Sequence, residues 1–182
     1  MGRVHPEIDD SLAAFVAAQP VYFVATAPLA SDGRVNVSPK GGSGTLVVVD
    51  PRTVAYLDLT ASGAETIAHL RENGRITVMV CAFEGRPQIV RLHGRGRAVT
   101  PQDADFDAWV GRFPPHPAVR AVIVVDVERV SDSCGFAVPL MEYVGERTIL
   151  DEANGRKDPE QVVAYRAAKN RTSIDGLPAV DW

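Results

Sequence analysis

The sequence has few cysteines, no excess of positive charge and no long apolar run. Cysteine occurs only at positions 81 and 134, too far apart for a CxxC or zinc-ligand spacing. No window reaches the roughly 18 apolar residues of a membrane-spanning helix. The N-terminus has no charged segment followed by a long apolar stretch. We therefore expect no metal site, no membrane partner and a cytoplasmic protein, with Cys81 as a small core residue.

The charge balance argues against nucleic acid as a partner. The 182 residues carry 19 Lys and Arg against 23 Asp and Glu, a formal net charge of −4. A nucleic-acid backbone is held by a broad basic surface, which this composition does not provide. The one basic run, 91–97, alternates so that Arg91, His93, Arg95 and Arg97 share one face of a strand. A solvated strand face and a local anion site both remain open for this run.

Strand signals dominate the first 130 residues. Hydrophobic residues make up 46 % of the chain and charged residues 23 %, as in ordinary globular domains. Runs of β-branched and aromatic residues bounded by turn residues predict strands. The predicted strands are 21–26, 34–38, 45–50, 53–58, 75–83, 88–99 and 119–130. The first four form two hairpins, and 119–130 is apolar enough to be buried on both faces. About seven strands with few helices predict a mainly β fold, a barrel rather than a parallel sheet.

Helical signals are short and lie between or after the strands. Asp9-Asp10-Ser11 precedes an Ala-rich run and predicts a capped helix over 12–18. A second helix is predicted over 64–72, stopped by Gly74, with His69 on its solvated side. Residues 101–113 and 158–170 also have helical character. We expect a single domain over 1–182, with a core at 1–130 and a C-terminal extension at 131–182.

Four pieces of the middle segment, taken in order, resemble the pyridoxamine 5'-phosphate oxidase-like family of flavin-binding split barrels. They are Val35–Gly41, Val54–Asp58, Gly63–Arg75 and Val90–Gly96. The signal lies in their order, because no single piece is diagnostic. The resemblance spans roughly the first two-thirds of the chain, a domain-sized stretch. It implies a split β-barrel of the FMN-binding type, with six to eight antiparallel strands and peripheral helices, that works as a homodimer.

The resemblance also implies where the cofactor binds. The segment Val37–Lys40 would lie along the isoalloxazine ring and the phosphate arm, and Leu57 with Asp58 would back the ring. The start of the helix at 64–72 would meet the phosphate, which gains unpaired backbone N–H groups and the positive end of the helix dipole there. The implied cofactor-binding residues are Val37, Ser38, Pro39, Lys40, Leu57, Asp58, Ser62, Gly63 and Thr66, with Arg91 as a further cation.

One departure from the family pattern bears on the cofactor. Members that bind the phosphate strongly tend to have Ser-Arg-Lys where this chain has Ala64-Glu65-Thr66, so two cations are missing and an acid is present. Lys40, Arg91 or Arg95 are candidates to compensate. FMN is the implied cofactor, and a deazaflavin, a larger relative or no cofactor remain open.

The implied function is an FMN-dependent oxidoreductase acting on a small-molecule substrate, with hydride transfer left to the flavin. The alternatives are a flavin- or deazaflavin-binding storage module without turnover, and a deazaflavin reductase. Individual residues keep two interpretations each. His93 is either an acid–base group or a packed residue, Asp58 either tunes the ring or caps a strand end, and Trp109 with Phe113 forms either a lid or core. The segment 131–141 crosses either the partner subunit or the chain's own surface.

Overall fold

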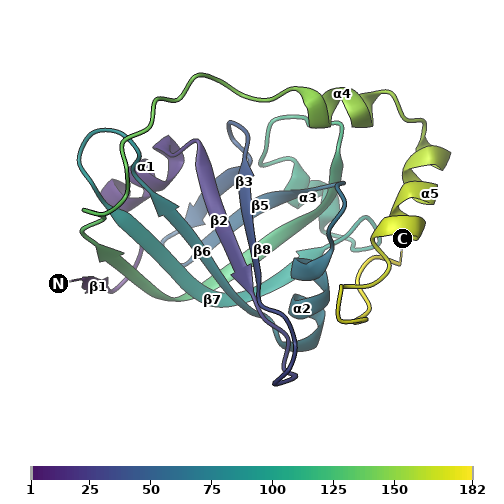
Figure 1. Cartoon of the computed structure of the whole chain (residues 1–182), viewed down its shortest axis with the longest axis horizontal. Helices are drawn as coiled ribbons and strands as arrows, with labels where there is room; N and C mark the ends of the chain where they lie inside the picture. The colour runs from purple at the N-terminus through teal and green to yellow at the C-terminus, as the bar shows by residue number, and fades with distance from the viewer. Residues whose placement is uncertain (1, 182) are drawn as a thin grey trace.

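The computed structural model describes residues 2–181 and contains one antiparallel sheet that curls into a half-open barrel (Figure 1). The sheet order is β3-β2-β6-β7-β8-β5-β4, and β1 also pairs with β8. The strands are β1 (Arg3–His5), β2 (Val21–Thr26), β3 (Asn36–Gly41), β4 (Leu46–Asp50), β5 (Thr53–Leu59), β6 (Arg75–Cys81), β7 (Ile89–Val99) and β8 (Val119–Ser133). The predicted fold class, a mainly β barrel of antiparallel strands, is confirmed.

Five helices lie around the barrel within the described residues. They are α1 (Asp10–Ala18), α2 (Glu65–Asn73), α3 (Phe106–Val110), α4 (Ile149–Gly155) and α5 (Pro159–Lys169). The predicted caps are present, since Asp9 accepts from the N–H of Leu12 at 2.8 Å and Gly74 ends α2 with a left-handed φ of 70°. Within residues 2–181, no helix has the length and hydropathy needed to cross a membrane.

Two apolar clusters lie on opposite faces of β5 and β8. The larger fills the barrel and is covered by α1 and α2; it includes Val54 and Tyr56 of β5. The smaller lies under α3 and includes Ala55 and Leu57 of β5. Successive residues of a strand point to opposite faces, so the side chains of β5 contribute alternately to the two clusters. Each fully buried Val or Leu contributes roughly 1.5–3 kcal/mol, so this alternation fixes the register of β5.

Both predicted hairpins form, and the remaining predicted strands are present. β2 pairs with β3 and β4 pairs with β5, and β8 continues three residues beyond the predicted end, to Ser133. The short strand β1 and the helix α4 were not predicted. The helix predicted over 101–113 is wrong in length, because only Phe106–Val110 is helical. Asp103 accepts from the N–H and hydroxyl of Thr100, a local turn that competes with helix at this start.

The prediction that His69 is solvated is wrong. The His69 side chain is 1 % exposed, and its Nδ1 lies 2.9 Å from the Thr26 hydroxyl. The helix α2 packs on β2, β6 and β7, and the far end of the chain covers its other side, where Arg71 donates to the carbonyl of Ala179. The sheet covers one side of α2 and the C-terminal segment covers the other. The helix is therefore buried, although its amphipathic sequence predicts one exposed side.

The C-terminal extension wraps around the barrel. Figure 1 shows the chain leaving β8, crossing over one end of the barrel to α4, and descending through α5 to the side of α2. Asp158 and Gln161 cap α5 reciprocally, with Pro159 at its first position. Several apolar side chains before α4 are exposed to solvent, with exposed fractions of 82 % at Phe136, 82 % at Leu140 and 93 % at Val144.

Candidate functional site

A buried carboxylate with two cations lies at the end of β5. Asp58 is 1 % exposed and accepts from Nε of Arg120 at 2.7 Å, an arginine that enters from the neighbouring strand β8 and is itself buried. Nζ of Lys40 lies 3.8 Å from the other carboxylate oxygen and 5.6 Å from the centroid of the Tyr56 ring. A carboxylate is tolerated in such a position only when it is paired and hydrogen-bonded. Asp58 therefore holds Arg120 and Lys40 in place; it does not cap the strand end.

A third cation approaches from the C-terminal extension. Nε and Nη2 of Arg166 donate to the Thr60 hydroxyl at 3.2 and 3.0 Å, and Nη2 also donates to the Val119 carbonyl at 2.9 Å. Burial lowers the pKa of the Arg166 guanidinium, the nearby charge of Arg120 lowers this pKa further, and Asp58 raises it. The cluster of Lys40, Arg120 and Arg166 thus has three positive charges around one carboxylate. Such an excess favours a bound anion.

The loop that follows β5 adjoins the same cluster, because Arg166 contacts Thr60 at its start. The β5–α2 loop (residues 60–64) leads into α2, whose N-cap residue Ala64 makes no side-chain cap. Within the described residues, no hydrogen-bond acceptor is found for the backbone N–H groups from Ala61 to Ile67. Ser62 and Gly63, at the tip of the loop, are exposed. A row of unpaired N–H groups at a helix N-terminus, next to a positive cluster, is suited to a phosphate-like anion.

A chain of hydrogen bonds connects β3 to the first turn of α2. The Ser38 hydroxyl donates to Oδ1 of Asn36 at 3.1 Å. Nδ2 of Asn36 donates to the hydroxyls of Thr66 at 3.3 Å and Thr26 at 3.4 Å. Thr26 in turn contacts His69. This network fixes the inner face of β3 against the helix start, so that the polar groups of the two elements keep a constant spacing.

The structure brings four of the predicted cofactor-binding residues together and separates others. Ser38 is connected to Thr66 through Asn36, and Lys40, two residues further along β3, lies beside Asp58. Their strand neighbours point away because of the period-2 alternation: Val37 and Pro39 lie on the exposed side of β3, and Leu57 lies in the cluster under α3. Ser62 and Gly63 remain at the loop tip, and the backbone of the loop, not the side chain of Leu57, borders the positive cluster.

The basic run on β7 is occupied by other contacts. Arg91 donates to the Ser133 hydroxyl at 3.1 Å, and Arg95 donates to the Asn73 carbonyl at 2.7 Å. Burial, aided by the charges of Arg129 and Arg91, lowers the pKa of His93, so its ring is neutral near pH 7. Phe113 is buried under α3 with Trp109 packed beside it, which fits the core interpretation of this pair.

Residues that the sequence reasoning missed complete the cluster. Arg120 interrupts the apolar run of β8, and a charged residue inside such a run is the signal that was available, because charged side chains are buried only when paired. Arg166 and Thr60 gave no comparable signal. No group of three or more His, Cys, Asp or Glu side chains within residues 2–181 is arranged to hold a metal ion.

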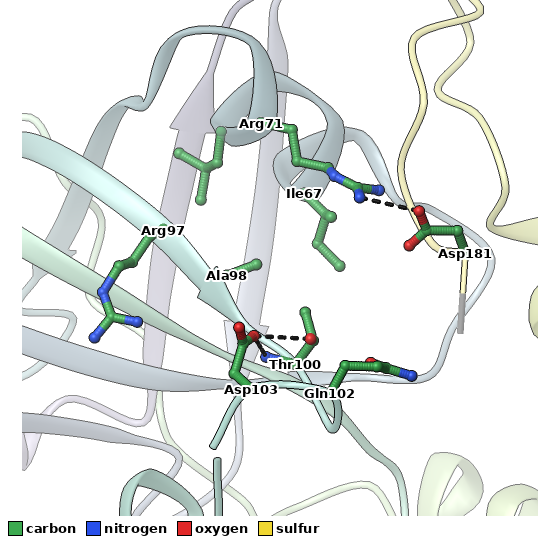
Figure 2. A pocket seen from close by; sticks show the side chains of 9 residues that line it. Ile67, Arg71, Arg97, Ala98, Thr100, Gln102, Asp103 and Asp181 are labelled. Carbon is green, nitrogen blue, oxygen red and sulfur yellow. Dashed lines mark hydrogen bonds and ion pairs between the residues drawn. The ribbon is translucent and has the colours of Figure 1, made fainter. Parts of the chain in front are cut away.

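Two pockets lie elsewhere on the surface. Figure 2 shows the first, of about 540 Å³, between α2, the end of β7 and the C-terminal segment. Its charged groups already have partners: Arg71 pairs with Asp181 at 3.0 Å, and Asp103 is bound by Thr100. The second pocket, of about 780 Å³, lies among the end of α1, the start of β2, the β3–β4 turn and the extended chain near Tyr143. It has mostly apolar walls and adjoins the strand that holds Lys40.

Comparison with known proteins connects these features to a family. The family model for pyridoxamine 5'-phosphate oxidase matches residues 8–134. The chain is 37 % identical over 197 aligned positions to the pyridoxamine 5'-phosphate oxidase family protein ustO of Aspergillus flavus, covering 97 % of this chain and 77 % of that protein. Among solved structures, HupZ from Group A Streptococcus superposes with a TM-score of 0.51 at 23 % identity, covering 68 % of this chain and 91 % of HupZ. A putative 5-nitroimidazole antibiotic resistance protein from Bacteroides thetaiotaomicron gives a TM-score of 0.50 at 13 % identity, covering 72 % and 87 %. These two structures share the fold.

Proposed function

Since the chain belongs to the pyridoxamine 5'-phosphate oxidase family, we propose that it binds FMN at the end of β5 and acts as a flavin-dependent oxidoreductase on a small organic substrate. The observation that carries the proposal is the coincidence of three cations with a row of unpaired backbone donors at the start of α2. A phosphate monoester carries close to two negative charges near pH 7. The residues present therefore fit the phosphate of FMN.

The proposal gives each part of the site a role. Lys40 neutralises part of the phosphate charge, and the carboxylate of Asp58, near the end of β5, orients the Lys40 ammonium group. The N–H groups of Ser62 and Gly63 and the first turn of α2 donate to phosphate oxygens. The exposed side of β3, with Val37 and Pro39, lies along the isoalloxazine ring. Leu57 supports the ring only through its main chain, because its side chain points into the cluster under α3. The flavin supplies hydride transfer, and the protein supplies binding, orientation and exclusion of water.

A homodimer and a substrate pocket are part of the same proposal. The extended segment exposes several large apolar side chains close together in sequence, among them Phe136, Leu140 and Val144. A soluble monomer rarely exposes a contiguous apolar patch of large size. We propose that a second copy of the chain covers them and closes the cofactor site. The 780 Å³ pocket beside the β3–β4 turn gives a small, largely apolar substrate room close to the end of β3. Both cysteines are free, which suits a cytoplasmic protein.

The decisive experiment is a binding measurement on the purified protein. We expect visible flavin absorbance, or saturable binding of added FMN, from a dimer in analytical ultracentrifugation. Lys40→Met should weaken FMN binding, whereas Arg156→Gln, at the exposed residue that follows α4, should not. A monomer with no bound flavin and no binding of added FMN contradicts the proposal.

A storage module without turnover is the second candidate. The observation that favours it is that the polar side chains near the site, Ser38, Asn36 and Thr66, are engaged with one another, so none is presented as an acid or base. Rapid reduction of the bound flavin by a nicotinamide cofactor, followed by transfer to an acceptor, would eliminate this candidate. Parallel titrations with FMN and a deazaflavin separate the two cofactor choices.

A further inference from the structure

The C-terminal extension holds the β5–α2 loop from outside. Nδ2 of Asn154, in α4, donates to the Thr60 carbonyl at 3.2 Å, and Nδ2 of Asn170, at the end of α5, donates to the Ala61 carbonyl at 2.8 Å. Arg166 binds the Thr60 hydroxyl between them. Asn154 and Asn170 are buried, at 6 % and 0 % exposure. Two helices that lie about a hundred residues beyond this loop in sequence thus contact it at consecutive residues.

The acid in the first turn of α2 belongs to the same arrangement. Glu65 occupies the place where a cation was expected by resemblance. Its two carboxylate oxygens accept from the N–H of Ile174 at 3.3 and 3.1 Å, which fastens the last segment of the extension to the start of α2. An acid is also stabilising in the first turn of a helix. The Glu65 carboxylate therefore helps to bind the extension to α2, because both of its oxygens accept from the extension.

We propose that the C-terminal extension replaces the missing cations of the phosphate loop, with Arg166 as the positioning residue. This inference rests on the proposed function. Arg166 carries a positive charge to the loop and fixes Thr60, while Asn154 and Asn170 fix the neighbouring carbonyls so that the N–H groups after Thr60 point outward together. An anion at those N–H groups also relieves the repulsion between Arg166 and Arg120, which adds to burial in lowering the pKa of Arg166.

A reciprocal effect follows from this arrangement. If the docked extension raises the affinity for a phosphorylated cofactor, the cofactor must stabilise the docked extension by the same factor. The connection between α4 and α5, around Lys157 and Asp158, should then become harder to cleave when FMN is bound. Riboflavin, which has the same ring and no phosphate, should protect it less.

The test compares FMN with riboflavin on the full-length protein. We expect Arg166→Gln to lower FMN affinity by about tenfold or more, as for a lost hydrogen-bonding contact of a charged group, and to leave riboflavin affinity within about twofold. Arg166→Lys keeps the charge and should recover part of the loss. Arg156→Gln is the matched control, because Arg156 lies in the same extension and is exposed, with Glu152 as its ion-pair partner.

Amide hydrogen exchange gives a readout that needs no cofactor. In the protein without added flavin, Arg166→Gln should speed exchange of the two hydrogen-bonded N–H groups that border the loop, those of Thr60 and Ala68, relative to wild type. Arg156→Gln should not. Equal losses for FMN and riboflavin, or an unchanged FMN affinity in Arg166→Gln, would overturn the inference. If wild type binds neither compound, the proposed function fails. In that case, amide exchange that is unchanged in Arg166→Gln overturns the inference as well. Faster exchange would show that Arg166 stabilises the loop even though the proposed function has failed.

Discussion

Replacing Asp58 by asparagine is expected to destabilise the fold by about 3 kcal/mol, within the range for breaking a buried ion pair. Asp58 is 1 % exposed and Arg120 is 3 % exposed, so solvent cannot take over the role of the lost charge. The asparagine keeps the shape of the side chain and one acceptor oxygen. It removes the counter-charge that Arg120 and Lys40 share. A loss of this size is a large share of the roughly 5–15 kcal/mol that stabilises a typical domain.

The two cations should not matter equally. Coulomb energy falls inversely with distance, so the 2.7 Å contact of Arg120 outweighs the 3.8 Å contact of Lys40 by a factor of about 1.4 in the same dielectric. The Lys40 side chain is also partly exposed, at 23 %, and solvent screens it further. We therefore expect Lys40→Met to cost less than about 1 kcal/mol, well below the cost of Asp58→Asn.

Urea unfolding of the protein without added flavin measures these differences. Glu152→Gln provides the control, because its ion pair with Arg156 is exposed and should contribute no more than about 0.5 kcal/mol. The double variant Asp58→Asn with Arg120→Met should be less destabilised than the sum of the two single variants, since each removes the same interaction. A free energy of unfolding for Asp58→Asn within about 1 kcal/mol of wild type would refute the reasoning from burial.

Three further outcomes are expected. Burial, followed by the charge of Asp58, raises the pKa of Tyr56 well above its usual value. Above about pH 10 the unfolded chain therefore binds fewer protons than the native one, and the free energy of unfolding decreases. Urea midpoints should decrease as the pH rises through this range, and the decrease should be smaller in Tyr56→Phe. Gly94→Ala places a Cβ at 2.0 Å from the Asp126 carbonyl oxygen and should lower thermal stability by several degrees or more, whereas Gly155→Ala, with open space around it, should not. A thiol reagent should modify Cys134 rapidly and Cys81 only on unfolding, because Cys81 is buried and burial raises its pKa; two fast thiols would contradict this.

The fold was largely predictable because its signals are local. The strands follow from β-branched runs, and both hairpins follow from the turn residues between them. The failures concern contacts made at long range. His69 is buried because its side of α2 packs on β2, where its ring contacts Thr26, and because the segment around Ala179 covers the other side of the helix. No pattern near His69 predicts contacts that far along the chain. The local turn at Thr100 shortened α3 for the opposite reason, since a short-range bond overrode a helical spacing.

The candidate site was predictable in part. Lys40, Asp58 and Thr66 lie on segments whose order carried the family resemblance. The structure places Lys40 beside Asp58 and connects Thr66 to β3 through Asn36. Leu57 and Asp58 were expected to act side by side, but neighbours in a strand face opposite ways, and this alternation was visible in the sequence. The contribution of Arg166 was not visible, because it depends on how α5 docks, and docking is set by tertiary packing rather than by local pattern.

The length and position of β8 have a consequence for biosynthesis. This strand of 15 residues joins β7 on one side and β5 on the other, and it also receives β1 from the start of the chain. Until Ser133 has left the ribosome, the nascent chain holds two unjoined pieces of sheet with apolar edges open to water. We expect ribosome-bound chains of intermediate length to recruit chaperones, and barrel closure to begin only when the last third of the protein is being translated.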